Sequence, residues 1–370
     1  MPQQFSSLKK FQALYTPQII QTLSDFFEKQ LELAKDKDRV LEDMVAVLKE
    51  FVLRGGKRLG PLMVILGYQL AKQLAASKQK VDGDIVTAAC SAETHHLYLL
   101  NLDDMADRDV LRHGGKTLEE YYKTEVFADW SDSDHHGRSF SSIAGSLLNS
   151  YTFEILNSSG FEPKRILKAI NVITEMLFTD TGVGWQIQYY QNNESVETAT
   201  EERFMKGLEY VTSRYKFVGP LLMGLALALD ESDVHFDQLK RFYRDFGRHV
   251  GIAFQIQDDI IGVFGDPKET GKAVGNDIRE GKKTLLIQRA YHQGNAKQKH
   301  VIAQALNNPL SIAQLENVQT VMKETGSLAY SQQLAEEHVQ LAIASLNDLP
   351  ACEEVEVMRE LAEYMVKRKV

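Results

Sequence analysis

The sequence is poor in cysteine and proline, and it has no apolar run long enough to cross a membrane. Its two cysteines, Cys90 and Cys352, lie far apart, and we expect them to be reduced thiols in a reducing compartment. The eight prolines form no linker, so we expect a single domain over residues 1–370. The longest apolar stretch, residues 217–229, is shorter than the roughly 20 residues that span a bilayer.

Signals for export and for nucleic-acid binding are also lacking. The first residues are polar and have no apolar core of the signal-peptide type, which predicts a cytoplasmic protein without a stable membrane anchor. The formal net charge of −9 gives no general reason to expect a nucleic-acid partner. A local cluster of cations can still hold one anionic substrate.

Apolar residues recur at helical spacing along most of the chain. One such face is formed by Val40, Leu41, Met44, Val47, Leu48 and Phe51, and we expect Leu33 to lie on the same face two turns earlier. Similar apolar helices are predicted over residues 62–74, 86–102, 142–156, 165–178, 217–229, 239–264, 284–292, 329–346 and 355–369. No segment shows sustained alternation with β-branched residues, so we expect no sheet. The fold class is therefore all-α, a large and mostly antiparallel helix bundle.

A first group of carboxylates comprises Asp103, Asp104 and Asp107, followed by Asp109. Positions 103 and 107 lie one turn apart on a helix, so their side chains share a face. Carboxylates placed in this way repel one another unless a cation neutralises them. Oxygen ligands on one face suit magnesium, which binds one or two carboxylates together with substrate phosphates and water.

A second group, Asp258 and Asp259, lies inside a helix that is otherwise apolar. Burying an acidic pair at such a position is costly without a partner. Either group alone could be a solvated acidic helix face. Together they favour two acidic helices that grip one diphosphate through bridging magnesium ions.

Glycine-flanked cations accompany both acidic groups. Arg54, Lys57 and Arg58 precede the apolar helix that begins near residue 62, a pattern typical of an anion site at a helix start. Arg112 and Lys116 follow the first acidic group. Lys272, Lys282 and Lys283 follow the second. The simplest interpretation is an anionic substrate that is chelated to metal ions and clamped by lysine and arginine.

These motifs, in this order, resemble those of the trans-isoprenyl diphosphate synthase (polyprenyl synthetase) family, of the geranylgeranyl or farnesyl diphosphate synthase type. The resemblance rests on Gly56-Lys57-Arg58, on Asp103-Asp104-x-x-Asp107 with Arg112, on Phe254-Gln255-x-x-Asp258-Asp259, on the segment from Phe264 to Lys282, on Thr325 to Leu328 and on the ending Leu361-Ala362-Glu363-Tyr364. It implies a bundle around a central cavity and usually a homodimer.

The resemblance also implies a role for individual residues. Lys57, Arg58 and His96 would hold isopentenyl diphosphate. Asp103, Asp107 and Asp258 would ligate three magnesium ions, supported by Asp104 and Asp259. The allylic diphosphate would contact Arg112, Thr212, Gln255, Lys272 and Lys282. Lys272 and the five aspartates form the predicted catalytic set.

The sequence departs from the family pattern at several positions. His113 stands where a second arginine is usual, and Val211 stands where a lysine usually precedes Thr212, a loss that Arg214 or Lys216 would have to offset. The other departures are Ser146 for an aspartate, Tyr189 for an aspartate and Gly262 for the third acid of the second motif. These departures bear on substrate preference and rate more than on the reaction class.

The implied reaction is prenyl transfer. Magnesium ions and cations stabilise the departing pyrophosphate, the allylic carbon–oxygen bond ionises, and the double bond of isopentenyl diphosphate attacks the resulting cation. The growing tail would run down the bundle, and Tyr98 and Leu99 lie ~6–7.5 Å below Asp103 along a helix axis. Tyr98 is either the floor of the tail pocket or an ordinary core aromatic residue. A floor there predicts products of fifteen or twenty carbons in this family.

Two other functions stay open on the sequence. A class I terpene cyclase also ionises diphosphates, but it would need neither Gly56-Lys57-Arg58 nor the Asp258-Asp259 motif. A weakly active partner subunit of a two-component synthase is favoured only by His113 and Val211.

Overall fold

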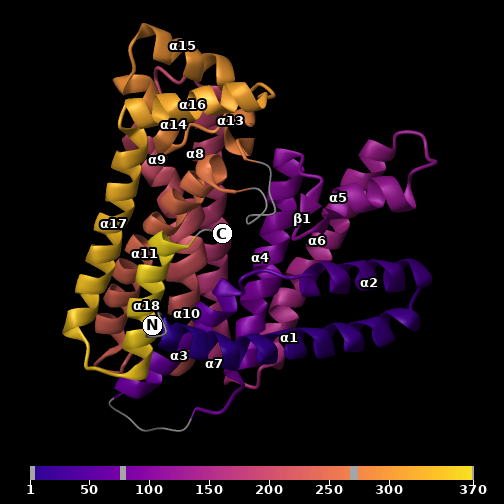
Figure 1. Ribbon diagram of the computed structural model, residues 1–370. Helices are drawn as coiled ribbons and strands as arrows, with labels where there is room; N and C mark the ends of the chain where they lie inside the picture. The colour runs from indigo at the N-terminus through magenta and orange to yellow at the C-terminus, as the bar shows by residue number, and fades with distance from the viewer. Residues whose placement is uncertain (1–4, 76–80, 267–273, 369–370) are drawn as a thin grey trace. The chain divides into compact units, whose positions relative to one another are not determined.

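The computed structural model describes residues 5–75, 81–266 and 274–368, which form two compact units (Figure 1). The first unit comprises Met1–Leu8, Thr174–Gly219 and Asp237–Val370, and the second comprises Lys9–Ile173 and Pro220–Phe236. The predicted all-α fold is confirmed. The prediction of a single domain stays a prediction.

The second unit contains most of the N-terminal helices. Its elements are α1 (Ser6–Lys35), α2 (Arg39–Leu53), α3 (Leu59–Leu74), α4 (Ile85–Asp107), β1 (Leu111–Arg112), β2 (Gly115–Lys116), α5 (Leu118–Tyr121), the π-helical η1 (Tyr122–Val126), α6 (Ser133–Ser158), α7 (Pro163–Val172) and α10 (Gly219–Ala228). Within the described residues, the expectation of no sheet is wrong at one short hairpin, β1–β2, where Leu111 pairs with Lys116 and Arg112 with Gly115.

The first unit contains the C-terminal helices. Its elements are the π-helical η2 (Ile173–Thr179), α8 (Asp180–Asn193), α9 (Glu201–Leu208), the π-helical η3 (Glu209–Val218), α11 (Phe236–Phe264), α13 (Asn276–Arg279), α14 (Leu285–Gln293), α15 (Ala296–Ala305), α16 (Ile312–Glu324), α17 (Ser327–Ser345), the 3-10 turn η4 (Leu346–Asp348) and α18 (Glu353–Lys367). None of the described helices is both long enough and apolar enough to cross a bilayer.

The expectation that Leu33 continues the apolar face of residues 40–51 is wrong. α1 ends at Lys35, and α2 starts again at Arg39 with Asp38 as its N-cap, whose side chain accepts a hydrogen bond from the Val40 amide. Since an aspartate in that position satisfies one of the unpaired amides of a helix start, it favours a break. Leu33 is 45% exposed and Val40 is 60% exposed, so neither is a core residue.

Two glycines let α3 and α10 cross at close range. A Cβ added at Gly67 would lie 2.5 Å from the Leu221 carbonyl oxygen, and one added at Gly224 would lie 2.3 Å from that of Val64. Only residues without a side chain fit such a crossing. α3 is buried nearly all round, as its apolar sequence predicts.

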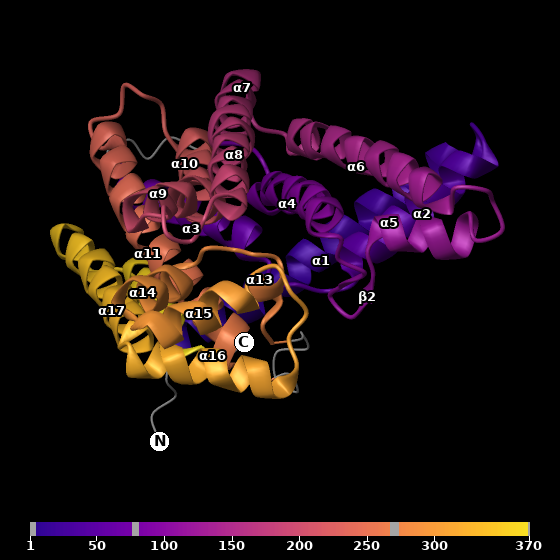
Figure 2. The ribbon, with the colours of Figure 1, turned by 90° about the horizontal axis from the view of Figure 1, so that it is seen from above.

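α4 and α6 lie side by side (Figures 1 and 2), and polar pairs join their buried faces. Thr94 Oγ1 lies 3.1 Å from Thr152 Oγ1, and His95 Nδ1 lies 3.2 Å from Asn149 Oδ1. Near the end of α4, the Ser141 hydroxyl donates to Asn101 Oδ1 at 2.8 Å. Since each buried polar group needs its own partner, these pairs specify the register of the two helices. That register positions the first acidic group, which ends α4.

Candidate active site

Both acidic groups lie at the C-terminal ends of long helices. Asp103 and Asp107 are in the last turns of α4, which ends at Asp107, and Asp258 and Asp259 are in the last turns of α11, which ends at Phe264. The unpaired carbonyl groups of a helix end already carry partial negative charge. Aspartates at such an end make the electrostatic potential more negative still. A bound divalent cation would neutralise this charge.

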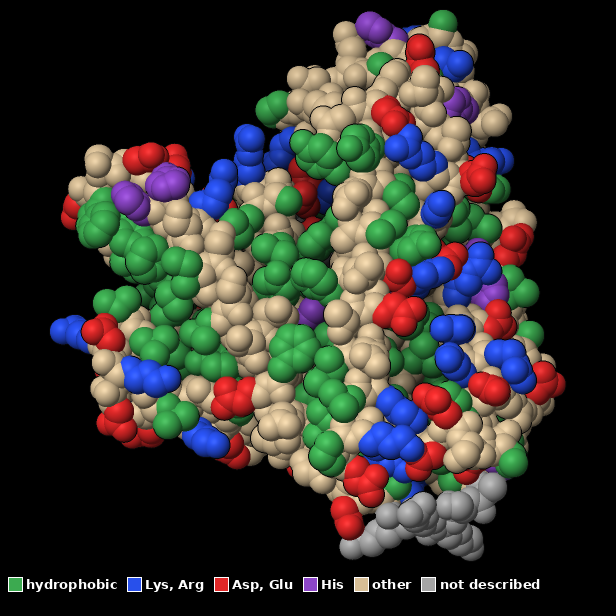
Figure 3. Space-filling view, turned by 180° about the vertical axis from the view of Figure 1, so that it is seen from behind, with side chains coloured by type: hydrophobic (Ala, Val, Ile, Leu, Met, Phe, Trp, Pro, Cys, Tyr) green, Lys and Arg blue, Asp and Glu red, His purple; other side chains and the backbone are tan. Residues whose placement is uncertain are grey.

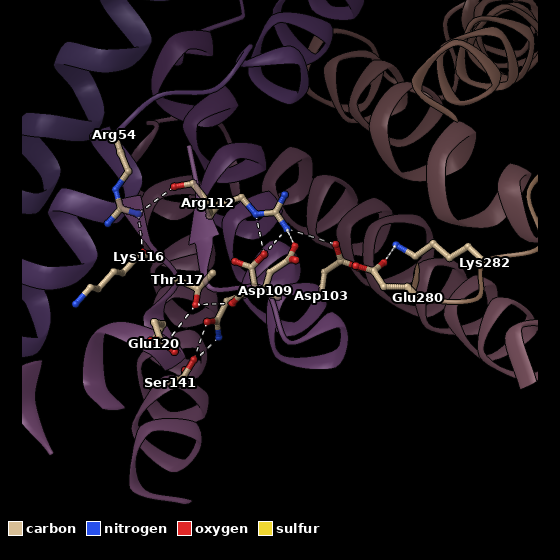
Figure 4. Close-up of polar contacts among 12 residues, drawn as sticks. Arg54, Asp103, Asp109, Arg112, Lys116, Thr117, Glu120, Ser141, Glu280 and Lys282 are labelled. Carbon is tan, nitrogen blue, oxygen red and sulfur yellow. Dashed lines mark hydrogen bonds and ion pairs between the residues drawn. The ribbon is translucent and has the colours of Figure 1, made fainter. Parts of the chain in front are cut away.

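Asp104 is buried and forms an ion pair with Arg112, which comes eight residues later. Arg112 Nε donates to Asp104 Oδ1 at 2.7 Å, and Arg112 Nη2 lies 3.3 Å from Asp109 Oδ2 and 3.8 Å from Asp103 Oδ2 (Figure 4). Burial raises the pKa of Asp104 to about 6, although the Arg112 guanidinium opposes the shift. Asp104 thus orients Arg112, while the Asp103 side chain remains 39% exposed and accessible to a ligand.

The hairpin that carries Arg112 is itself held by Arg54. Arg54 Nη1 donates to the carbonyl oxygens of Arg112 at 3.1 Å and of Lys116 at 2.7 Å. A Cβ added at Gly115 would lie 2.4 Å from the Arg54 guanidinium carbon, so this glycine makes room for the arginine. The sequence pattern assigned Arg54 to an anion site, whereas the structure uses it to position the hairpin.

Of the two cations expected to bind isopentenyl diphosphate, Lys57 is exposed and Arg58 is buried. Arg58 is the N-cap residue of α3 and lies in the left-handed region, with φ 51°. Its guanidinium contacts Glu93 and donates to the Val52 carbonyl at 2.8 Å. Burial raises the pKa of Glu93, and Arg58 opposes this. A Cβ added at Gly56 would lie 3.3 Å from His113 Cε1, so the loop before Lys57 approaches the hairpin tip. The roles of Lys57, Arg58 and His96, which lies on α4, in binding the substrate stay predictions.

In the first unit, a chain of hydrogen bonds links Thr212, Gln255 and Asp259. The Thr212 hydroxyl donates to Gln255 Oε1 at 2.8 Å, and Gln255 Nε2 donates to Asp259 Oδ1 at 2.8 Å. Burial, and then the nearby Asp277, raise the pKa of Asp259 well above its usual value. Thr212 lies in the π-helical η3, a local distortion that is frequent at functional sites and that sequence periodicity does not reveal.

Gly262 replaces an acid, and Asp277 occupies the space of the missing side chain. A Cβ at position 262 would lie 3.0 Å from Asp277 Oδ2. Lys282 Nζ lies 3.5 Å from Asp277 Oδ1. It also lies 2.8 Å from Glu280 Oε2 (Figure 4). The structure thus brings a carboxylate from the short helix α13 next to the second motif, and sequence spacing alone did not identify it. Lys272, predicted to act here, lies outside the described residues.

Val211 and Tyr189 also differ from the family pattern, and the structure shows the surroundings of both residues. A Cβ added at Gly184 would lie 2.5 Å from Val211 Cγ2, so Val211 packs against α8. Arg214 pairs with Asp180 at 3.1 Å, and Lys216 Nζ lies 5.0 Å from the centre of the Phe254 ring. Tyr189 is 71% exposed. Arg214, proposed to offset Val211, is thus engaged by acids of its own unit.

Arg368 is a further residue at the second motif. Its Nη1 donates to Asp258 Oδ1 at 2.9 Å. The sequence offers one sign of this contact, the basic residues Lys367 and Arg368 at the end of α18. Basic residues in that position are equally typical of a helix end exposed to solvent.

The two residues predicted to form the floor of the tail pocket, Tyr98 and Leu99, lie on different faces of α4. Leu99 is 2% exposed. Tyr98 is half-buried and packs toward α6, because a Cβ added at Gly145 would lie 3.5 Å from its Cδ2. At about 100° per residue, Leu99 lies ~40° around the helix from Asp103 and Tyr98 ~140°.

The donor set fits a magnesium ion that is shared with a substrate. Among residues 5–75, 81–266 and 274–368, no group of three or more histidine, cysteine or acidic side chains lies close enough to hold a metal ion alone. Asp104 Oδ2 and Asp259 Oδ2 are buried without a hydrogen-bond partner among the same residues. Exposed carboxylates beside such oxygens suit an ion that takes its remaining ligands from phosphates and water.

The chain is similar to known proteins over most of its length. The family model described as polyprenyl synthetase matches residues 42–325. Geranylgeranyl diphosphate synthase of Sulfolobus acidocaldarius is 28% identical over 321 residues, which cover 85% of this chain and 88% of that protein. Geranylfarnesyl diphosphate synthase of Aeropyrum pernix is 28% identical over 319 residues, which cover 85% and 91%.

The structural comparison agrees. The crystal structure of geranylgeranyl pyrophosphate synthase from Corynebacterium glutamicum, complexed with isoprenyl diphosphate and magnesium, superposes with a TM-score of 0.85 at 28% identity and covers 98% of this chain and 99% of that chain. The predicted all-α isoprenoid synthase fold and the predicted prenyltransferase activity are confirmed. The chain belongs to the polyprenyl synthetase family and is an enzyme that makes trans-prenyl diphosphates.

Proposed function

We propose that the enzyme condenses isopentenyl diphosphate with dimethylallyl, geranyl or farnesyl diphosphate and releases a short-chain product of fifteen or twenty carbons. The observation that carries this proposal is the pair of acidic helix ends. Each places an accessible aspartate, Asp103 or Asp258, directly before a buried one that is held by a fixed partner. Metal-bound diphosphate recognition requires such accessible, oriented carboxylates.

In this proposal Asp103, Asp107 and Asp258 hold three magnesium ions. The relative from Corynebacterium glutamicum, whose structure contains magnesium and isoprenyl diphosphate, supports the use of a divalent metal. Bound magnesium would neutralise the charge that develops on the pyrophosphate as it leaves.

The side chains of the enzyme bind and orient both substrates. Lys57 and His96 would hold isopentenyl diphosphate, with Arg58 acting through its buried contact with Glu93. Arg112, Lys272 and Lys282 would contact the allylic diphosphate, whose departing pyrophosphate takes the bonding electron pair.

Hydrogen bonds and apolar side chains complete the proposed site. Thr212 and Gln255 would keep Asp259 oriented. The double bond of isopentenyl diphosphate supplies the electrons of the new carbon–carbon bond, and the released pyrophosphate then accepts the proton that leaves. The apolar flanks of α4 and α11 would exclude water, which otherwise captures the cation.

A homodimer is part of the proposal. Hydrophobic side chains gather on the face shown in Figure 3, including an area near the two histidines at the upper left. Around η1 and α6, Val126, Trp130 and Ile143 are 46%, 57% and 54% exposed. The rings of Phe127 and Trp130 pack edge to face, with their centres 4.9 Å apart. Apolar side chains gathered on one side favour association. Sedimentation analysis of the wild type and of an Ile143→Glu variant tests it, since a dimer formed there should dissociate in the variant.

Radiolabelled isopentenyl diphosphate, offered with five-, ten- and fifteen-carbon allylic primers, tests the reaction. We expect products of fifteen or twenty carbons from the purified single chain with magnesium, and none with a chelator. Incubation with farnesyl diphosphate alone should release no hydrocarbon. Hydrocarbon release would indicate a terpene cyclase, and no turnover by the single chain would indicate a partner subunit. We expect the enzyme to act in the cytoplasm.

A further inference from the structure

The C-terminal end of α18 is anchored in the second acidic motif. Arg368 directly follows α18, and its amide donates to the Tyr364 carbonyl. Its side chain is 1% exposed, whereas that of the preceding Lys367 is 46% exposed. Burying a guanidinium is costly, and such groups are retained where they are paired and hydrogen-bonded.

Several contacts fix the Arg368 guanidinium on one face of α11. Nη1 donates to Asp258 Oδ1 at 2.9 Å, and Nη2 donates to the Phe254 carbonyl at 2.7 Å. The guanidinium carbon lies 4.1 Å from the centre of the Phe254 ring. In return, Gln257 Nε2 donates to the Arg368 carbonyl at 3.1 Å. A planar guanidinium held at this many points gives its partner carboxylate a defined direction.

The pairing leaves the carboxylate accessible. The Asp258 side chain is 46% exposed although Arg368 contacts Oδ1. Because the guanidinium is buried and held by the α11 backbone, an incoming cation does not have to displace it. A fixed hydrogen-bond donor behind a metal-binding carboxylate is a typical outer-shell partner, which orients the ligand.

We propose that Arg368 is a positioning residue for metal binding, which holds the Asp258 carboxylate in the direction in which it binds a divalent cation. The inference rests on the proposed function, which makes Asp258 a metal ligand. It makes the residue that follows α18 part of the second acidic site, so metal binding at Asp258 depends on the contacts of Arg368.

Binding of Mn²⁺ by the full chain, measured by electron paramagnetic resonance in the presence of inorganic pyrophosphate, tests this role without turnover. We expect Arg368→Gln to weaken Mn²⁺ binding by about tenfold, within the range found for outer-shell partners. Arg368→Lys keeps the charge but not the planar fork, so it should recover part of the affinity. The matched control is Lys367→Gln, which removes the same charge one residue earlier and should leave binding unchanged.

A double-substitution cycle separates positioning from a general structural effect. If Arg368 acts through Asp258, then Arg368→Gln should not weaken Mn²⁺ binding further in an Asp258→Asn background. Unchanged or tighter binding in Arg368→Gln would overturn the proposal, because tighter binding means that the arginine competes with the metal. If Asp258→Asn alone binds Mn²⁺ like the wild type, the proposed metal role of Asp258 fails first. Melting temperatures without metal identify variants that do not fold, and Arg368→Lys then carries the test.

Discussion

Arg112 Nε donates to Asp104 Oδ1 at 2.7 Å, and this contact ties the hairpin to the last turn of α4. Both groups are largely buried, so neither can exchange its partner for water. The pair places one guanidinium beside Asp103 and Asp109, where the negative charge of the first motif is greatest.

We therefore expect Arg112→Gln to destabilise the protein by about 3–5 kcal/mol at pH 7, because it leaves a buried carboxylate uncompensated. The loss should be smaller at pH 6 than at pH 7. Without Arg112 the pKa of Asp104 rises above its wild-type value of about 6, so the variant takes up a proton at a pH where the wild type does not, and the neutral acid tolerates burial. Urea unfolding at both pH values measures the effect. Arg108→Gln, at an exposed position on the same segment, is the control and should change stability little. Equal losses in the two variants would contradict this account.

The Gln255 side chain accepts a hydrogen bond from Thr212 and donates one to Asp259, so replacing Gln255 removes both hydrogen bonds. We expect Gln255→Leu to cost ~2 kcal/mol of stability, because the buried hydroxyl and carboxylate lose a partner. Activity should fall by about tenfold as Asp259 loses its orientation. Steady-state prenyl transfer and thermal unfolding measure the two effects. Gln333→Leu, which removes an exposed glutamine paired with Glu337, should change neither, and full activity in Gln255→Leu would exclude the orienting role.

The contact between His338 and His249 leads us to expect that the protein loses stability in mild acid. Their Nδ1 atoms lie 2.8 Å apart, and burial, followed by the charge of His249, lowers the pKa of His338 to about 4. Asp245, Arg248, Glu209 and Glu337 are the charged groups that act on the pair. An unfolded histidine titrates near pH 6.5, so the unfolded chain binds a proton that the folded chain does not. The contribution of neutral His338 to the free energy of unfolding is therefore fully present above about pH 6.5 and is lost as the pH falls toward 4.

Between pH 7.5 and 5 the loss from this histidine amounts to about 2 kcal/mol. Denaturant unfolding of the wild type and of His338→Gln at both pH values measures it, because the variant should lose that much less. His300→Gln, at an exposed position of α15, serves as the control and should follow the wild type. Parallel pH dependences of the wild type and His338→Gln would contradict the assignment.

Product length tests the floor of the tail pocket. We expect Tyr98→Ala to lengthen the product, because a smaller side chain opens the space below the acidic motif. Chromatography of the dephosphorylated products gives the chain length, and Tyr190→Ala, which truncates a 62% exposed tyrosine, should leave it unchanged. An unchanged product in Tyr98→Ala removes Tyr98 from the floor. If Leu99→Ala alone lengthens the product, the tail follows the face of α4 that carries Asp103.

The sequence alone predicted the helices whose apolar residues recur at helical spacing, and the motifs whose residues lie close together in the sequence. The apolar segments of α3, α4, α6 and α11 were recognisable because burial repeats with the helical period. The acidic groups were recognisable because neighbours on a helix share a face. The break before α2 was missed because one capping aspartate outweighed the apolar pattern on either side.

The tertiary structure decided which partner each charged group takes. Arg54, Arg58 and Arg112 look equivalent in the sequence, yet one holds a hairpin, one pairs with a buried glutamate and one orients an aspartate. Asp277 reaches the second motif from α13, and Arg368 reaches it from the residue after α18, 110 positions beyond Asp258. Helical periodicity reports burial along one element, whereas hydrogen bonds and ion pairs depend on contacts between elements, which composition and spacing do not encode.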